Sequence, residues 1–167
     1  MSIFISIASY QDPLLVSTIF SAYNNARNKD ELVFSICDQS DDGIKVEEIG
    51  FVDQIHYEHV NPLFSKGPCW ARHRAQNFFN DEDFFLQIDS HTQFAPNWDV
   101  IFIDQLNKIA STTSDDGYFE KPIITAYPRS FEVVDFDKGV FALNMGDKFT
   151  QVIMYRKDGL FSSGSFS

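Results

Sequence analysis

The fold is decided by residues 67–94, GPCWARHRAQNFFNDEDFFLQIDSHTQF, which predict a helix, a tight turn and a buried strand. Pro68 suits the first position of a helix, and apolar residues then recur at helical spacing over about thirteen residues. A short apolar run closed by polar residues predicts the strand, which contains Phe84, Phe85, Leu86 and Ile88. A helix and a strand of these lengths both span roughly 20 Å, so the chain goes out along one and returns along the other.

Asp89 and His91 come at the end of this strand and form a candidate metal site. Residues i and i+2 of an extended segment point the same way, so these two can present a carboxylate and an imidazole to one ion. The two ligand types favour Mn²⁺ over Ca²⁺, with substrate phosphates and water filling the remaining positions. An ordinary surface pair of an aspartate and a histidine is the alternative interpretation.

Arg72 lies in the first turn of the predicted helix, at the sheet edge where the strand delivers Asp89 and His91. Open α/β sheets bind ligands beyond the carboxyl ends of their strands, and a helix N-terminus favours anions. A cation, a guanidinium and a helix start at one edge therefore suit a diphosphate. The alternative is an Arg72 that caps its helix or pairs with the acidic residues 81–83.

Asp38, Ser9 and Tyr10 are candidate nucleoside contacts at the same edge. Asp38 follows a predicted strand over residues 32–37, and its carboxylate can accept a hydrogen bond from a base or a ribose hydroxyl. Ser9 and Tyr10, together with Asp12, follow the first predicted strand and could line a base pocket with an aromatic face and a polar contact. Ordinary turn chemistry explains all of these residues nearly as well.

The order of the predicted elements indicates an α/β class. Residues 3–8 and 32–37 are predicted strands with a helix between them, which implies parallel pairing through a right-handed crossover. A further helix is predicted over 98–109, and further strands over 52–60, 122–127, 131–134, 140–144 and 150–156. We therefore expect a single domain over residues 1–167 with a mostly parallel sheet flanked by helices.

Composition excludes several function classes. The formal net charge of −11 argues against nucleic-acid binding, because a phosphate backbone would meet net repulsion. The sequence contains no long apolar run and no signal-peptide pattern, so we expect no membrane partner and a cytoplasmic location. Cys37 and Cys69 form no paired motif, and both are expected to be small buried hydrophobes.

The chain resembles the GlcNAc-transferase family in three segments, IFISIASYQDP, GPCWARHRAQ and FFLQIDSHTQFAPNWD. This family is typified by the cytoplasmic hydroxyproline N-acetylglucosaminyltransferase of ubiquitin-ligase subunits. It has the glycosyltransferase-A fold and is similar in its nucleotide half to polypeptide GalNAc-transferases, which carry a comparable Asp-Ser-His. The resemblance spans most of residues 3–127 and implies a glycosyltransferase-A-like (Rossmann-like) fold.

The resemblance also implies roles for the candidate residues. Asp89 and His91 would bind a divalent cation, Mn²⁺, that bridges the diphosphate of UDP-GlcNAc. Arg72 would lie beside the nucleotide, and Asp38 falls where such folds place an acidic residue on the uridine. The expected reaction is transfer of GlcNAc to a hydroxyl acceptor of a protein or glycan, such as hydroxyproline, Ser or Thr, with retention of anomeric configuration.

The chain departs from the family in its later part. Family members run well past this length, and their later segment supplies most of the acceptor site and usually a further metal-binding histidine, whereas no histidine follows His91 here. We therefore expect a fragment of a longer protein, with a natural C-terminus ending in a frayed strand as the alternative. Two other functions stay open. One is a non-catalytic nucleotide-sugar-binding or interaction module, and the other is a metal-dependent hydrolase of phosphate esters.

Overall fold

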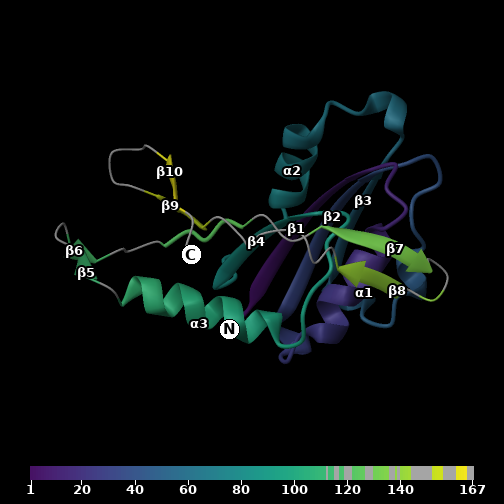
Figure 1. Cartoon of the computed structure of the whole chain (residues 1–167). Coiled ribbons are helices and arrows are strands. Elements are labelled where there is room, and N and C mark those ends of the chain that lie inside the picture. The colour runs from purple at the N-terminus through teal and green to yellow at the C-terminus, as the bar shows by residue number, and fades with distance from the viewer. Residues whose placement is uncertain are drawn as a thin grey trace. The chain divides into compact units, whose positions relative to one another are not determined.

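The computed structural model describes residues 1–111, 113–114, 117–118, 122–126, 130–135, 138, 140–143, 152–155 and 161–164. Its internal contacts divide the chain into two units, Met1–Asp99 and Val100–Ser167 (Figure 1). All of the candidate site residues belong to the first unit. The expectation of one domain over the whole chain stays a prediction.

The first unit contains a four-stranded parallel sheet. Its strands are β1 (Ile3–Tyr10), β2 (Leu32–Gln39), β3 (Ile55–Val60) and β4 (Phe84–Asp89), in the order β3-β2-β1-β4. Every neighbouring pair is parallel, which confirms the pairing predicted for the first two strands. The α/β class with a parallel sheet flanked by helices is therefore confirmed, and the arrangement is consistent with a Rossmann-like fold.

Helix α2 (Pro68–Gln76) covers one face of the sheet. Its two buried residues, Ala71 and Ala75, form a small apolar cluster with Cys37 of β2 and the partly buried Ala8 of β1. Alanine has no side chain beyond Cβ, so the helix approaches the strands closely. The hydroxyl of Ser35 donates a hydrogen bond of 2.7 Å to the carbonyl oxygen of Ala75, which fixes the helix end on β2.

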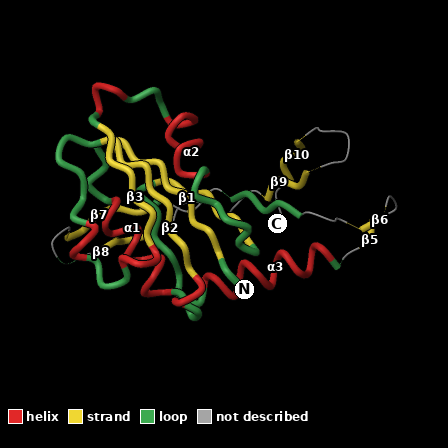
Figure 2. The backbone as a smooth tube through the Cα atoms, turned by 180° about the vertical axis from the view of Figure 1, so that it is seen from behind, coloured by secondary structure: helices red, strands yellow, loops and turns green. Residues whose placement is uncertain are grey.

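Helix α1 (Leu15–Asn25) lies on the opposite face (Figures 1 and 2). Phe34 and Cys37 are three residues apart in β2 and therefore point to opposite sides of the sheet. The ring of Phe34 contacts Phe51, which in turn stacks on Tyr23 of α1 at 3.6 Å between ring centroids. Aromatic rings thus join α1 to the sheet, whereas small side chains join α2 to it.

Two predictions for residues 67–94 are wrong. Helix α2 ends at Gln76 instead of near residue 80. The chain leaves the helix through a turn, and the centroid of the Phe79 ring then lies 5.4 Å from the centroid of the Phe4 ring. Strand β4 is not buried. It lies at the edge of the four-stranded sheet, its residues alternate between partly buried and exposed, and Phe85 is 44% exposed.

Strand β3 is shorter than the strand predicted over 52–60, since residues 52–54 form a single 3₁₀ turn before it. Helix α3 (Trp98–Ala110) spans the boundary between the two units, close to its predicted bounds. None of the helices in the described ranges is long and apolar enough to cross a membrane.

The second unit contains short antiparallel pairs in its described residues. The strand predictions near 131–134, 140–144 and 150–156 are confirmed, whereas residues 122–126 form no strand and residue 127 lies outside the described residues. The pairs are β5 with β6, β7 with β8 and β9 with β10. Their bounds are Thr113–Ser114, Gly117–Tyr118, Phe131–Asp135, Val140–Leu143, Val152–Tyr155 and Phe161–Gly164.

Candidate functional site

A pocket of about 420 Å³ lies at the carboxyl ends of β1 and β2, beside the start of α2. Gly67 precedes the helix with φ of 88°, a left-handed conformation that glycine adopts without strain, and so lets the chain turn into the first helical turn. Ala8 is part of the wall and pairs in register with Asp89 of β4, which brings the pocket next to the candidate metal ligand. The lining residues are Ala8, Ser9, Tyr10, Gln39, Ser65, Gly67 and Pro68.

The side chain of Gln39 connects the segments that line this pocket, a role that the sequence did not predict. It is 2% exposed, its Nε2 donates to the carbonyl oxygen of Ser9 at 3.0 Å, and its Oε1 accepts from the Ser65 hydroxyl at 2.6 Å. One amide thus joins the ends of two strands to the loop before α2. The available signal was its position directly after Asp38, at the end of the predicted strand.

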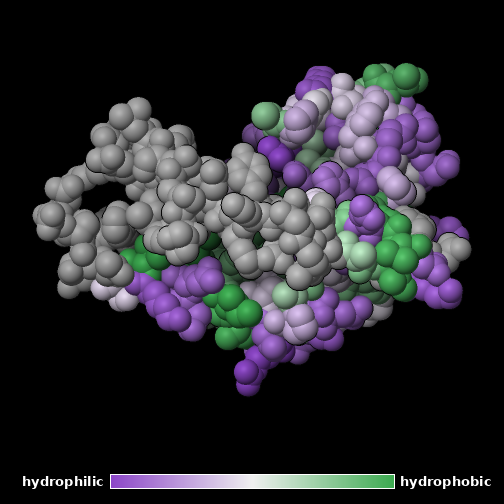
Figure 3. All heavy atoms as spheres, in the orientation of Figure 1, coloured by the Kyte–Doolittle hydropathy of each residue, from purple (hydrophilic) through white to green (hydrophobic). Residues whose placement is uncertain are grey.

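Ser9 and Tyr10 both line the pocket, and their contact with a nucleoside stays a prediction. The Tyr10 side chain is 59% exposed and offers an aromatic surface at the mouth. Ser9 is 1% exposed, and its hydroxyl has no hydrogen-bond partner among the described residues. Leu63 and Phe64 precede α2 with 89% and 71% exposure, and hydrophobic side chains are visible at the top right of the surface in Figure 3.

Asp38 lies outside the pocket wall and is buried at 1% exposure. Its carboxylate accepts a hydrogen bond of 2.9 Å from the Tyr57 hydroxyl, and that hydroxyl accepts one from the backbone N–H of Ile44 at 2.8 Å. Burial raises the pKa of Tyr57, and the hydrogen bond to Asp38 raises it further, so the phenol stays a donor. The carboxylate therefore stabilises the loop after β2, and its contact with a nucleoside stays a prediction.

Arg72 and Asp89 meet at the carboxyl edge of the sheet. The guanidinium Nη2 lies 3.1 Å from Asp89 Oδ1, and the two side chains are 34% and 63% exposed. The Nε–H of Arg72 is buried without a hydrogen-bond partner among the described residues. Arg72 thus pairs with the predicted ligand, rather than with residues 81–83, and keeps donor capacity for a further acceptor.

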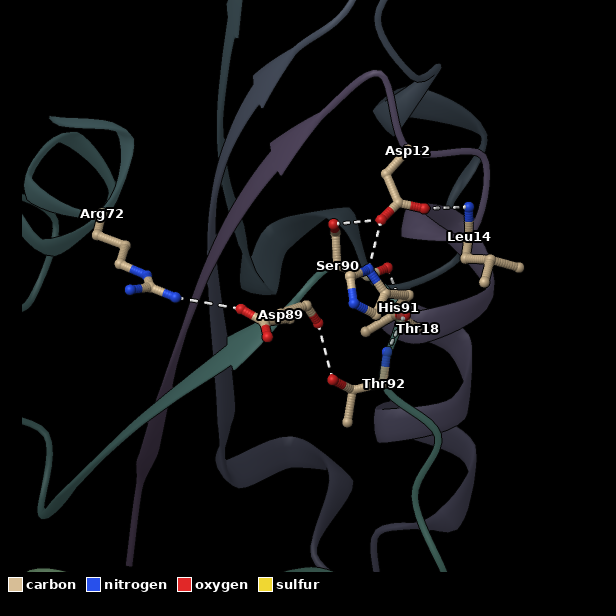
Figure 4. A network of polar contacts seen from close by, with 8 residues as sticks. All are labelled: Asp12, Leu14, Thr18, Arg72, Asp89, Ser90, His91 and Thr92. Carbon is tan, nitrogen blue, oxygen red and sulfur yellow. Dashed lines mark hydrogen bonds and ion pairs between the residues drawn. The ribbon is translucent and has the colours of Figure 1, made fainter. Parts of the chain in front are cut away.

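His91 is turned toward a different partner. Strand β4 ends at Asp89, and residues 90 and 91 form a turn, so the two-residue period of a strand does not extend to His91. Its Nδ1 lies 2.8 Å from Oδ2 of Asp12, before helix α1. Figure 4 shows the two sets of contacts, Arg72 with Asp89 on one side and His91 with Asp12 on the other.

Asp12 gathers three hydrogen bonds at this point. Its Oδ2 accepts from the Ser90 hydroxyl at 2.7 Å as well as from His91, and its Oδ1 accepts from the backbone N–H of Leu14 at 2.9 Å. Burial alone would raise the pKa of Asp12, but the hydrogen bonds from His91, Ser90 and Leu14 lower it below its ordinary value. The sequence analysis placed Asp12 in the base pocket and did not foresee its contact with His91.

Helix α1 also forms hydrogen bonds with the turn that follows β4. The Thr18 hydroxyl donates to the carbonyl oxygen of Ser90 at 2.7 Å and accepts from the backbone N–H of Thr92 at 3.0 Å. The Thr92 hydroxyl donates to the carbonyl oxygen of Asp89 at 2.8 Å. The backbone from Asp89 to Thr92 is therefore fixed at both ends by hydrogen bonds.

Two further histidines and the two cysteines are potential metal ligands. The register places His56 beside Ser35 and His59 beside Asp38, on opposite faces of the sheet, so these two histidines are a poor ligand pair. Cys37 is buried, and burial raises the pKa of its thiol to about 11, but the prediction that Cys69 is buried is wrong. Cys69 lies at the second position of α2, where its side chain is exposed.

Within the described part of the chain, no three His, Cys, Asp or Glu side chains gather closely enough to hold a metal ion by themselves. A cation at this edge would take one carboxylate and one imidazole from the protein, from Asp89 and His91. Oxygen atoms of a substrate would have to complete its coordination.

The family of the chain follows from comparison with known proteins. The model of the family described as Glycosyltransferase (GlcNAc) matches residues 40–156, well over half of the sequence, and the chain belongs to this family. The matched segment contains Arg72, Asp89 and His91 and begins after Ser9, Tyr10 and Asp38. Comparison with curated proteins and with solved structures gives no match. Membership supports glycosyl transfer as the class of chemistry.

Proposed function

We propose that this domain transfers GlcNAc from UDP-GlcNAc to a hydroxyl acceptor, on a glycosyltransferase-A-like version of the α/β fold. The observation that carries the proposal is the ion pair of Arg72 and Asp89, because it lies inside the family segment and next to the pocket. The carboxyl edge of a parallel sheet and the start of a helix are where such folds bind anionic ligands. Cytoplasmic location and the lack of membrane or nucleic-acid partners stay predictions from composition.

The pocket suits the nucleoside part of the donor. Its volume of about 420 Å³ falls in the range of small-molecule sites. Tyr10 offers a ring for stacking on a base, and the backbone around Gly67 offers polar contacts. The diphosphate would then extend from the pocket toward the first turns of α2 and the guanidinium of Arg72.

The residues present fit a divalent cation that the substrate helps to hold. Nδ1 of His91 is engaged by Asp12, which leaves Nε2 as the ring nitrogen for an ion, and Arg72 contacts only Oδ1 of Asp89. A carboxylate and an imidazole favour Mn²⁺ among the candidates. When bound, such an ion supplies positive charge that stabilises the β-phosphate of departing UDP more in the transition state than in the ground state.

The chain's own contribution to the reaction is positioning and charge. The bond between the anomeric carbon and the β-phosphate oxygen breaks, and a bond from the acceptor oxygen forms on the same face of the sugar, with retention. Arg72 would hold the charge that develops on the leaving UDP, through the part of its guanidinium that is exposed beside Asp89. The hydroxyl proton of the acceptor, such as hydroxyproline, Ser or Thr, leaves with a base that these residues do not identify.

One observation favours a second candidate, a non-catalytic module that keeps the nucleotide site. Both proposed metal ligands already have protein partners, Asp89 with Arg72 and His91 with Asp12. A phosphate-ester hydrolase is less well supported, because such enzymes gather more ligands than the described residues bring together.

Turnover separates these functions. The full chain is incubated with UDP-GlcNAc, Mn²⁺ and a hydroxyproline-containing peptide, and UDP release and the peptide mass are measured. We expect UDP release with addition of GlcNAc to the peptide, and loss of both in Asp89→Asn. The control Asp104→Asn removes an exposed carboxylate that pairs with Lys108 and should leave turnover unchanged. A chain that binds UDP but releases no UDP from UDP-GlcNAc would support the non-catalytic module instead.

A further inference from the structure

The carboxylate of Asp12 is more buried and has more hydrogen bonds than that of Asp89. Its side chain is 14% exposed, against 63% for Asp89, and its contacts with Leu14, Ser90 and His91 are all 2.9 Å or shorter. One contact is with the backbone N–H of Leu14 in the turn before α1, and the other two reach the turn after β4. Asp12 therefore connects a rigid helix to the residue proposed as a metal ligand.

The chemistry of this contact selects one form of His91. An ionised carboxylate only accepts hydrogen bonds, so the atom 2.8 Å from Asp12 Oδ2 must be a protonated Nδ1. In the neutral ring the proton on Nδ1 leaves the lone pair on Nε2, which is the form that can bind a metal ion. Histidines that bind metals commonly donate their other ring N–H to a carboxylate or a carbonyl, and that partner orients the ring.

We propose that Asp12 is a positioning residue that fixes His91 in the Nδ1–H tautomer and directs Nε2 to the cation of the site. This inference rests on the proposed function, because it takes His91 as a metal ligand. The role assigned to Asp12 is indirect. Its effect on the reaction runs entirely through the ring of His91.

A purely structural role for Asp12 is the competing explanation, since the same carboxylate binds Ser90 and the backbone N–H of Leu14 before α1. The two roles separate at Ser90. Replacing Ser90 with alanine removes one hydrogen bond to Asp12 but leaves the contact with His91, so it loosens the turn without releasing the tautomer. Ser90→Ala is thus the matched control for Asp12→Ala.

The first measurement needs no metal. Long-range ¹H–¹⁵N spectra of the full chain with ¹⁵N-labelled histidine, at about pH 8.5, report which ring nitrogen carries the proton in the neutral ring. His91→Gln assigns the signal. We expect Nδ1–H in the wild type and in Ser90→Ala, and a shift toward the Nε2–H form, which free histidine favours in water, in Asp12→Ala.

Two results would overturn the inference. One is a wild-type His91 that carries its proton on Nε2, and this result does not depend on any variant folding. The other is a tautomer that stays Nδ1–H in an Asp12→Ala chain whose circular dichroism matches the wild type.

A second measurement links the tautomer to the ion. Free Mn²⁺ is followed by electron paramagnetic resonance while chain and UDP are titrated, and we expect Asp12→Ala to weaken Mn²⁺ binding by about 10- to 100-fold relative to Ser90→Ala. Equal affinities would overturn the positioning role. Nδ1–H in a wild-type chain that binds no Mn²⁺ would instead overturn the proposed metal, and with it the ligand role of His91.

Discussion

The guanidinium of Arg72 lies 3.1 Å from the carboxylate of Asp89, so helix α2 and edge strand β4 are joined at the carboxyl end of the sheet. In the proposed function the same carboxylate also binds a cation. Arg72 and the cation therefore compete for Asp89 when no nucleotide is present, whereas both act on the diphosphate once UDP is bound.

Removing Arg72 should change the two affinities in opposite directions. In Arg72→Gln we expect Mn²⁺ to bind about two- to five-fold more tightly without UDP, because the ion pair is partly exposed and contributes less than about 1 kcal/mol. UDP should bind more weakly, because a phosphate contact is lost. Paramagnetic resonance measures the first affinity and calorimetry the second.

Lys45→Gln is the control for this pair, since it also removes one cation from an exposed ion pair, with Glu48. It should leave both affinities unchanged. Parallel weakening of Mn²⁺ and UDP binding in Arg72→Gln would show that Arg72 supports the fold of the site rather than competing with the ion.

Asp99 should matter for stability although it lies outside the site. It is 1% exposed and accepts hydrogen bonds of 2.9 Å from the backbone N–H groups of Arg27 and Asn28. Asp99→Ala leaves these donors without that acceptor, so we expect the free energy of unfolding in urea to fall by about 2–4 kcal/mol. Asp104→Ala, on the exposed side of the same helix, should lower it by less than about 0.5 kcal/mol. Similar losses in both variants would contradict this role.

The sequence predicted the elements of the first unit well, because strong local patterns encode them. The apolar run of β1 and the proline before α2 specify a strand and a helix without help from the rest of the fold. The predictions from sequence are wrong where tertiary contacts determine the local structure. Phe78 and Phe79 extend the helical pattern of α2, but the chain turns before them and the Phe79 ring packs on Phe4 of the sheet.

The candidate site was predicted in part for the same reason. Arg72 and Asp89 come together because a helix and a parallel strand of matching direction return to one edge. The contact of Asp12 with His91 could not be predicted, since it joins positions 79 residues apart and depends on a turn that ends the strand at Asp89. The contacts of Asp99 with the backbone after α1 are of the same kind, since they join positions more than 70 residues apart.

Gly43 should be sensitive to substitution because it lies against the Asp38 network. Its φ is 69°, and a Cβ there would lie 2.8 Å from the Tyr57 hydroxyl, which bonds to Asp38. We expect Gly43→Ala to lower the free energy of unfolding by about 1–3 kcal/mol. No atom lies within 4 Å of the position that a Cβ would take at Gly50, so Gly50→Ala should change the free energy of unfolding by less than about 0.5 kcal/mol. Equal effects, measured by urea unfolding, would argue against close packing of this loop.

The two cysteines should differ in reactivity. A thiol reagent in excess should label Cys69, which is exposed, and leave Cys37 unlabelled until the chain unfolds. Mass spectrometry of the native chain should therefore show one label, and Cys69→Ser should show none. Rapid labelling of Cys37 in the native chain would contradict its burial between α2 and the sheet.

The pH dependence of the free energy of unfolding should also report the burial of Cys37. Burial raises the pKa of its thiol from 9.0 to about 11, so over this range the unfolded chain releases a proton that the folded chain keeps. The free energy of unfolding of the wild type, relative to Cys37→Ala, should therefore fall as pH rises from 9.0 to about 11. A constant difference across this range would contradict the burial of the thiol.

Calorimetric titration of the full chain with UDP, with and without Mn²⁺, tests the central claim most directly. The proposed site predicts UDP binding that requires Mn²⁺ and that Asp89→Asn weakens on the order of tenfold or more, with Asp104→Asn unchanged. UDP binding of equal affinity without Mn²⁺ and in Asp89→Asn would contradict the claim that Asp89, beside Arg72, holds the cation for a departing diphosphate.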